Sequence, residues 1–263
     1  ERTGSLWDCG EFVLGAYKLQ VVHPPGAPLF LIVGRMFTYI AELFSDTAAN
    51  PENIAFAVNL MSGICTAFGA MFICWVTMIF GKLSLMSREE TPTQGQSYAL
   101  AGAGVIAGLA MAFCSSVWFS AVEGEVYAMS SLFTAIVFWA ILKWEVEVDK
   151  YEQAVAAESG FRGNPDRWIV FIAYMIGLSI GVHLLNLLAI PAIGFVIYFK
   201  KYKKVEPLAF IITGVVSIVT LGVVQSVLIP KSVSIADWFE RLFVNTLGMP
   251  FNTGFYIFVV LVV

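Results

Sequence analysis

Charged residues are scarce in this chain of 263 residues: only 13% are Asp, Glu, Lys or Arg, against about a quarter in ordinary soluble domains. Hydrophobic residues make up 59% of the sequence, and the mean hydropathy is +0.80. A water-soluble fold cannot bury that much apolar surface. The composition therefore predicts an all-α polytopic membrane protein, and it excludes secreted, disordered and nucleic-acid-binding classes. The net charge of −4 identifies no partner.

Cysteines and nucleotide-binding motifs are also few. Cys65, Cys74 and Cys114 lie in apolar runs and Cys9 lies alone in a polar stretch, so no disulfide framework is predicted. The chain has no Walker loop, dinucleotide-binding glycine pattern, HExxH pair or nucleophile elbow, so nucleotide-driven transport has no support. Because residue 1 is Glu and the last apolar run, 255–263, is short, we expect a piece of a longer protein.

Apolar runs predict where the chain crosses a membrane. One apolar stretch, Trp168–Phe199, has 32 residues, which is too long for a single span. It is interrupted by His183 and Asn186, so it predicts two short helices that meet at a polar turn. We expect residues 1–53 to form an external first loop. Residues 54–263 are expected to form a transmembrane bundle of about six full spans and a truncated last one. The clear spans are Ala55–Phe80, Tyr98–Val122, Val126–Lys143 and Leu208–Ile229.

Basic residues orient these spans because Lys and Arg are retained on the cytoplasmic side. The best threading places residues 1–53, the turns around Glu123 and His183, and segment 230–250 on the external face. It keeps ten of the fifteen basic residues inside: Lys82, Arg88, Lys143, Lys150, Arg162, Arg167, Lys200, Lys201, Lys203 and Lys204.

This threading requires that the apolar segment Ala27–Phe44 does not cross the membrane. Arg35 lies near its centre and Glu42 near its end. A charged side chain at the middle of a bilayer is costly unless it is paired. The segment therefore predicts an interfacial or re-entrant helix.

Two pairs of acids are candidates for chemistry on the external face. Asp8 and Glu11 share one face if their segment is helical, and a partly desolvated carboxylate can act as a general base. A solvated acidic surface is the alternative. Glu123 and Glu125 lie between two apolar helices, where they could bind a divalent cation such as Mg²⁺ or Mn²⁺, position a hydroxyl-bearing substrate or pair with basic residues. A short exposed turn is the alternative for this pair.

The two histidines stand at expected turns. His23 precedes Pro24-Pro25-Gly26, a rigid elbow that aims its side chain or serves only as a structural turn. His183 lies three residues before Asn186 in apolar surroundings. This pair either has a functional role or forms a hydrogen-bonded contact between helices.

Several motifs resemble one family of polytopic proteins. They are WDCGEF at 7–12, HPPGAPLF at 23–30, EGEVYA at 123–128 and GLSIGVHLL at 177–185. The family was long known only as a domain of unknown function, is abundant in Bacteroidota and related bacteria, and includes a eukaryotic protein O-mannosyltransferase of the endoplasmic reticulum. The likeness covers nearly the whole chain.

The resemblance implies the GT-C glycosyltransferase fold, a transmembrane helix bundle with amphipathic interfacial helices in the first external loop. It implies a sugar donor on polyprenyl phosphate and inverting transfer, with mannose as the expected sugar, to Ser or Thr of an exported protein. By this likeness Asp8 is the acid that deprotonates the acceptor hydroxyl, with Glu11 as its companion. Glu123 and Glu125 fall where the fold places an acidic pair in the second external loop.

A departing phosphate needs positive charge. The external-side candidates are Lys18, His23, Arg35, His183, Lys231 and Arg241, of which His23 and Arg35 belong to the matched motif.

We expect the site to face the periplasm from a bacterial inner membrane, with the bilayer and a larger membrane assembly as further partners. Three alternatives stay open: transfer to a lipid or polysaccharide, a transporter whose path is lined by Glu123, Glu125 and His183, and a silent assembly subunit.

Overall fold

The structure is a computed structural model that describes residues 7–87, 90–158, 163–202 and 204–262. Within these ranges all regular structure is helical. Five helical segments there are long and apolar enough to cross a membrane: Glu52–Leu85, Gln94–Ala112, Val126–Ala156, Leu184–Lys201 and Pro207–Thr246. The chain is therefore an all-α polytopic membrane protein, as the composition predicts. Four basic residues used for orientation, Arg2, Arg88, Arg162 and Lys203, lie outside the described residues.

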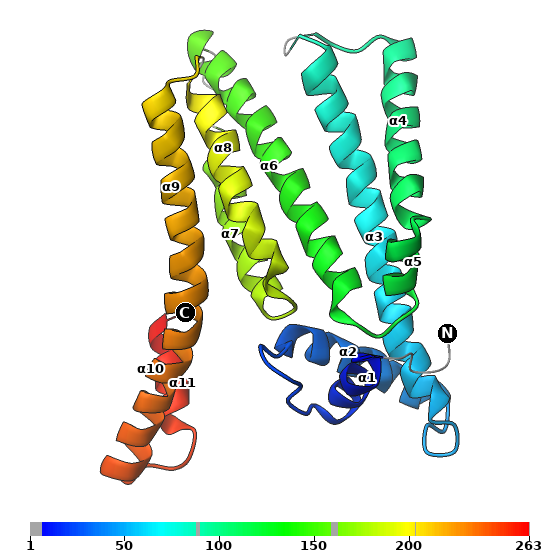
Figure 1. Cartoon of the computed structure of the whole chain (residues 1–263), viewed down its shortest axis with the longest axis vertical. Coiled ribbons are helices and arrows are strands. Elements are labelled where there is room, and N and C mark those ends of the chain that lie inside the picture. The colour runs from blue at the N-terminus through cyan, green and yellow to red at the C-terminus, as the bar shows by residue number, and fades with distance from the viewer. Residues whose placement is uncertain (1–6, 88–89, 159–162, 203, 263) are drawn as a thin grey trace. The chain divides into compact units, whose positions relative to one another are not determined.

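The chain divides into two compact units, Glu1–Ala189 and Ile190–Val263, which are described separately. In the first unit, α6 packs between α3 and α7, and α4 packs along α3 (Figure 1). Two shorter helices, α1 and α2, lie across one end of this bundle (Figure 1). The helices of this unit are α1 (Cys9–Lys18), α2 (Pro28–Phe44), α3 (Glu52–Leu85), α4 (Gln94–Ala112), α5 (Ser115–Ala121), α6 (Val126–Ala156), α7 (Asp166–Ile180) and the 3₁₀ helix η1 (Leu184–Leu188).

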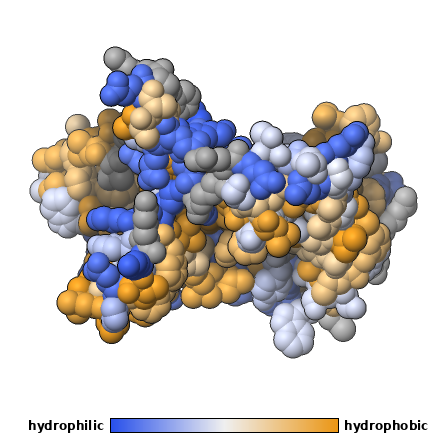
Figure 2. Space-filling model, turned by 90° about the horizontal axis from the view of Figure 1, so that it is seen from above, coloured by the Kyte–Doolittle hydropathy of each residue, from blue (hydrophilic) through white to orange (hydrophobic). Residues whose placement is uncertain are grey.

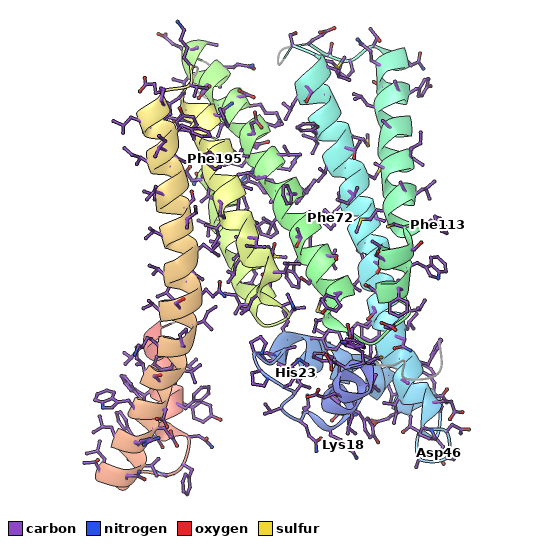
Figure 3. All side chains as sticks on the ribbon, viewed as in Figure 1. Lys18, His23, Asp46, Phe72, Phe113 and Phe195 are labelled. Carbon is purple, nitrogen blue, oxygen red and sulfur yellow. The ribbon has the colours of Figure 1, made fainter. Side chains whose placement is uncertain are left out.

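Aromatic and small side chains hold the long helices together. Phe72 of α3 lies toward α6 (Figure 3), and its ring centroid is 5.3 Å from that of Trp139. On the other side of α3, a Cβ at Gly104 or Gly108 of α4 would approach a carbonyl oxygen of α3 to 2.9 Å. Glycine at these two positions therefore allows the close approach of α4 and α3.

The contacts of α1 and α2 fix the end of the bundle where the external loops are predicted. Gly34 of α2 faces Ala16 of α1 so closely that an added Cβ would lie 2.8 Å from the Ala16 Cβ. At the start of α2, the Leu29 amide donates a hydrogen bond of 2.7 Å to the Gly181 carbonyl, just after α7. The buried core joins α1, α2, α3 and α6 through Phe12, Phe30, Met61 and Val126. Whether α1 and α2 lie on a membrane surface stays a prediction.

One predicted span is not a single continuous helix. The run Tyr98–Val122 is two helices, because α4 ends at Ala112 and α5 begins at Ser115. Cys114 adopts an extended conformation, with φ −64° and ψ 132°, which interrupts the helix. Phe113 marks this junction in Figure 3. The run contains neither Pro nor Gly at the junction, so the sequence carried no signal for the break.

The stretch Trp168–Phe199 is divided as predicted. After α7 the chain turns at Gly181 and His183, and then continues through η1 into α8 (Ala189–Lys201). The 15 residues of α7 measure about 22 Å at 1.5 Å per residue, less than the hydrocarbon thickness of about 30 Å. The first of the two predicted short helices is thus shorter than a full crossing.

The second unit contains α8, α9 (Pro207–Val223), α10 (Ile229–Arg241) and α11 (Thr253–Val262). Helical structure continues beyond the predicted span Leu208–Ile229, from Pro207 to Thr246. A π-helical turn, Val224–Leu228, ends two residues before Pro230, whose ring and missing N–H do not fit a regular α-helix. Near the end of this unit, the Glu240 carboxylate accepts the Asn252 and Phe255 amides at 2.6 and 3.0 Å and so caps α11.

Candidate functional site

A small pocket of about 70 Å³ lies at the end of the first unit where α1, α2, the α5–α6 connection and the α7–η1 turn meet. It brings together four of the residues that the sequence singled out: Asp8, His23, Glu125 and His183. The full lining is Asp8, Phe12, His23, Pro25, Gly26, Ala27, Glu125, Val126, Tyr127, Val182 and His183. The geometry thus assembles the predicted groups, while their roles in catalysis stay predictions.

His23 is held by Glu11 through two hydrogen bonds. The His23 backbone amide donates to Oε1 of Glu11 at 2.6 Å, and Nδ1 of the ring lies 2.9 Å from Oε2. These contacts raise the pKa of His23, chiefly through the side-chain hydrogen bond, and lower the pKa of Glu11 for the same reason. The imidazole edge also packs on the Phe12 ring, with the centroids 5.6 Å apart. The two residues form a charge pair in which Glu11 is the acceptor.

Asp8 and Glu125 are the two acids that line the pocket. Asp8 stands directly before α1, but its carboxylate makes no capping hydrogen bond to that helix. Glu125 precedes α6 and is buried. Burial raises the pKa of Glu125, and the charges of Glu123 and Asp8 raise it further, while a hydrogen bond from the Asp8 backbone opposes the shift. Asp8 and Glu125 are therefore coupled, and Glu125 holds a proton to higher pH than an isolated glutamate.

A contact between Cys9 and Gly124 places the glutamates next to α1. The Gly124 amide donates to Sγ of the buried Cys9 at 3.2 Å. A Cβ at Gly124 would lie 2.9 Å from Val13 and 3.0 Å from Val58, so only glycine fits this turn without displacement. Glu123 and Glu125 each have only 6% of their surface exposed, which makes the alternative of a solvated turn wrong.

His183 contributes a ring at the opposite wall. Its Nδ1 accepts a hydrogen bond of 3.1 Å from the Leu185 amide at the start of η1. In the neutral imidazole the proton is then on Nε2, which is left to donate a hydrogen bond. The ring of Tyr127 lies 5.7 Å away. Asn186 instead donates to Oγ of the buried Ser179 at 3.0 Å, which is the helix contact that was the alternative for this pair.

Neither Arg35 nor Lys18, the other predicted basic residues of the first unit, lines the pocket. Arg35 donates to Oε1 of Glu42 at 3.0 Å and lies 3.7 Å from the centroid of the Tyr39 ring. Lys18 lies at the end of α1, over the Tyr17 ring. Lys231 and Arg241 belong to α10 of the second unit, where Arg241 pairs with Asp237 at 3.0 Å.

A divalent cation has one candidate donor set among the described residues. One ligand atom from each of Asp8, Glu11 and His23 can be chosen so that all lie within 4.8 Å of one another. Imidazole together with carboxylates suits Mn²⁺ or Zn²⁺ better than Mg²⁺. Because Glu11 and Nδ1 of His23 already bond to each other, a cation would have to displace that hydrogen bond. The predicted cation pair Glu123 and Glu125 is not part of this set.

Sequence reasoning gave no role to two residues that build the site. Phe12 packs against the His23 ring, and Tyr127 lines the pocket with its ring centroid 5.7 Å from that of His183. Both belong to the motifs 7–12 and 123–128, so aromatic residues inside those motifs were the available signal. Figure 3 shows His23 at this end of the bundle, beside α1 and α2.

The comparisons with known proteins place most of the first unit in one family. Residues 8–206 match the family described as the protein O-mannosyl-transferase TMEM260 N-terminal domain. The protein O-mannosyl-transferase tmem260 of Dictyostelium discoideum is 22% identical over 184 residues, which cover 70% of this chain and 19% of that protein. The mouse protein of the same name is 24% identical over 153 residues, 58% of this chain and 18% of the relative. The chain thus spans less than one fifth of these relatives. No solved structure matches.

Proposed function

Because the chain belongs to the family of the protein O-mannosyl-transferase TMEM260 N-terminal domain, we propose that it is the membrane part of a GT-C glycosyltransferase. The proposed reaction moves mannose from a polyprenyl-phosphate donor to a Ser or Thr hydroxyl of an exported protein. The names of the relatives support protein mannosyl transfer. The donor, the inverting course and the acceptor rest on the resemblance to the GT-C fold, and the pocket offers groups that suit such a step.

The observation that carries the proposal is the convergence of two acids and two imidazoles in one pocket. Glycosyl transfer to a hydroxyl needs a base for the hydroxyl proton and positive charge or hydrogen-bond donors for the leaving phosphate. Asp8 and Glu125 offer the first function, and His23 and His183 offer the second. A transporter path would instead place ionisable groups along the spans.

Asp8 is the proposed base. Glu11 is occupied by two hydrogen bonds from His23, and these contacts lower its pKa. Asp8 makes no capping hydrogen bond and lines the pocket, so its carboxylate is available to the acceptor. Glu125, whose pKa is raised, is the proposed positioning group because its protonated form donates a hydrogen bond.

In the proposed step, the acceptor O–H bond breaks and its proton goes to the Asp8 carboxylate. The acceptor oxygen forms a bond to the anomeric carbon from the face opposite the phosphate. The bond from that carbon to the phosphate oxygen breaks, and its electron pair leaves with the lipid phosphate. His23, whose cationic form Glu11 favours by raising its pKa, and Nε2 of His183 stabilise the leaving group. One displacement of this kind inverts the configuration.

The pocket is proposed to face away from the cytoplasm. The basic residues Lys82, Lys143 and Lys150 lie at the opposite end of the spans, and Lys and Arg favour the cytoplasmic side. In a bacterial inner membrane the pocket would then open to the periplasm. An exported acceptor protein is available on that side.

Transfer by the purified full-length protein in detergent tests the proposal. Polyprenyl-phosphate-mannose and a pool of Ser/Thr peptides are supplied, and peptide mass is measured. The Asp8→Asn variant is compared with Asp166→Asn, an exposed aspartate at the start of α7. We expect a hexose mass gain that Asp8→Asn abolishes and Asp166→Asn retains.

Other outcomes separate the alternatives. Donor binding without peptide transfer would indicate a lipid or polysaccharide acceptor. A proton flux in liposomes, without donor binding, would indicate a transporter.

A further inference from the structure

A second cavity, of about 360 Å³, lies in the first unit between α3, α4 and α6. It is at the end where α3 stops and α4 starts, opposite α1 and α2 (Figure 1), and α3 and α6 diverge toward it. Hydrophilic residues gather on this end of the molecule, whereas hydrophobic residues form much of its margin (Figure 2). The cavity is therefore distinct from the pocket around Asp8.

The walls of this cavity are amphipathic. Met78, Leu83, Leu100 and Val146 give it an apolar lining, and polar residues near the helix ends line it as well. Three of these polar groups are Lys82, Lys143 and Lys150, and one is Asp149. Such a wall suits a molecule with a hydrocarbon chain and an anionic head better than it suits a free ion.

The lining of the cavity carries a net positive charge, because it contains three lysines and one aspartate. Lys150 contacts Glu147 at 3.3 Å but keeps 57% of its side chain exposed. The ammonium of Lys143 is 6.0 Å from the centroid of the Trp168 ring, and Lys143 is only partly buried. Lys82 lies in the last turn of α3, where the helix dipole also favours a cation. Basic pockets between membrane helices on the cytoplasmic side bind anionic lipid head groups.

We propose that this cavity is a binding site for an anionic phospholipid of the cytoplasmic leaflet. The phosphate contacts Lys82, Lys143 and Lys150, and an acyl chain lies along the apolar wall between α3 and α4. The lipid fills the space where α3 and α6 diverge and so holds the bundle together. The site does not depend on transfer activity at the other end of the spans.

Lipid retention measured by native mass spectrometry tests this proposal. The full-length protein in neutral detergent is titrated with phosphatidylglycerol and, separately, with phosphatidylcholine of the same acyl chains. The variants are Lys82→Gln, Lys143→Gln, Lys150→Gln and the triple change. Lys204→Gln, an exposed lysine before α9 that does not line the cavity, is the matched control.

We expect preferential binding of phosphatidylglycerol, weakened about fivefold by each single change and about 100-fold by the triple change. The control should bind like the unmodified protein. Circular dichroism and size exclusion in neutral detergent check folding, and Lys150→Gln keeps the test valid if the triple variant does not fold, because its side chain is largely exposed.

Three results would overturn the proposal. The first is equal binding of the two lipids, and the second is binding that the lysine variants leave unchanged. The third is stronger binding of polyprenyl phosphate than of phosphatidylglycerol, which would assign the cavity to the donor lipid or its product. Inorganic phosphate at millimolar concentration should not displace the lipid, and displacement would show that the head group alone is recognised.

Discussion

Glu11 accepts two hydrogen bonds from His23, one from the backbone amide at 2.6 Å and one from Nδ1 of the ring at 2.9 Å. The pair joins α1 to the elbow before α2. Because each residue stabilises the charged form of the other, His23 remains cationic to higher pH and Glu11 is a poor proton acceptor. We therefore propose different tasks for the two acids of the motif 7–12, with Asp8 as the base and Glu11 as the counter-ion of His23.

The two acids should differ in their kinetic effects. Removal of a general base costs about 10²- to 10⁴-fold in rate, so we expect Asp8→Asn to lower kcat by that range with donor binding retained. Glu11→Gln should lower kcat by only about tenfold, because it changes the charge of His23 and leaves the base in place. Single-turnover transfer with both variants gives these values. A larger loss in Glu11→Gln than in Asp8→Asn would exchange the two roles.

The pH dependence of transfer should report the Glu11–His23 pair. The pKa of His23 is raised, so its positive charge is present at low pH and is lost as pH rises through the folded-state pKa. Glu11→Gln removes the main cause of that shift, and the alkaline limb of the kcat profile should move to lower pH. The charges of Asp8 and Glu125 also face His23 and keep part of the shift. An unmoved alkaline limb would show that another group controls it.

The same pair has a defined effect on stability. His23 contributes stability that is fully present below its ordinary pKa of 6.5 and is lost as pH rises through the raised value. The contribution of Glu11 is present above its ordinary pKa of 4.5 and is lost as pH falls through the lowered value. The unfolding temperatures of Glu11→Gln and of the unmodified protein should therefore differ most at pH values between the ordinary pKa of Glu11 and the ordinary pKa of His23.

The spans and the shared location of the acids could be predicted because both depend on properties of short segments of the sequence. Apolar length marks α3 and α6, and counts of basic residues placed the Glu123 turn and the His183 turn at the same end, where the pocket lies. The break at Cys114 was missed because no Pro or Gly marks it.

Long-range partners were also beyond the sequence. The hydrogen bond from Gly124 to Cys9 joins residues 115 positions apart, and its donor is a backbone amide, which every residue except proline carries. The Arg35–Glu42 contact was accessible in principle, because residues seven apart lie on one helix face.

Chelation tests whether a cation takes part. The positive charge for the leaving phosphate is proposed to come from His23, whose Nδ1 is occupied by Glu11. We therefore expect EDTA to leave the transfer rate unchanged within about twofold. Loss of activity that Mn²⁺ restores, and that His23→Gln makes insensitive to Mn²⁺, would assign the cation to the Asp8, Glu11 and His23 set instead.

Arg35 is predicted to act through Glu42 more than through the donor. Both side chains are largely buried, with 16% and 27% exposed, and they meet at 3.0 Å. Arg35→Gln and Glu42→Gln should each lower the free energy of unfolding by about 1–3 kcal/mol. The double variant should lose less stability than the sum of the two single losses. The KM for the donor should stay unchanged. A raised donor KM in Arg35→Gln alone would support the phosphate role that the sequence motif favours.

Gly124 should be intolerant of any side chain. A Cβ there would lie 2.9 Å from Val13, 3.0 Å from Val58 and 3.1 Å from Asn59, so Gly124→Ala should cost about 1–3 kcal/mol of stability. The turn would also move Glu125 away from Asp8 and lower kcat. Gly10→Ala is the matched control, since nothing lies within 4 Å of its Cβ and alanine favours the helix. Denaturant unfolding and transfer rates of the two variants should diverge. Equal behaviour would mean that the Cys9–Gly124 contact does not hold the acidic turn in place.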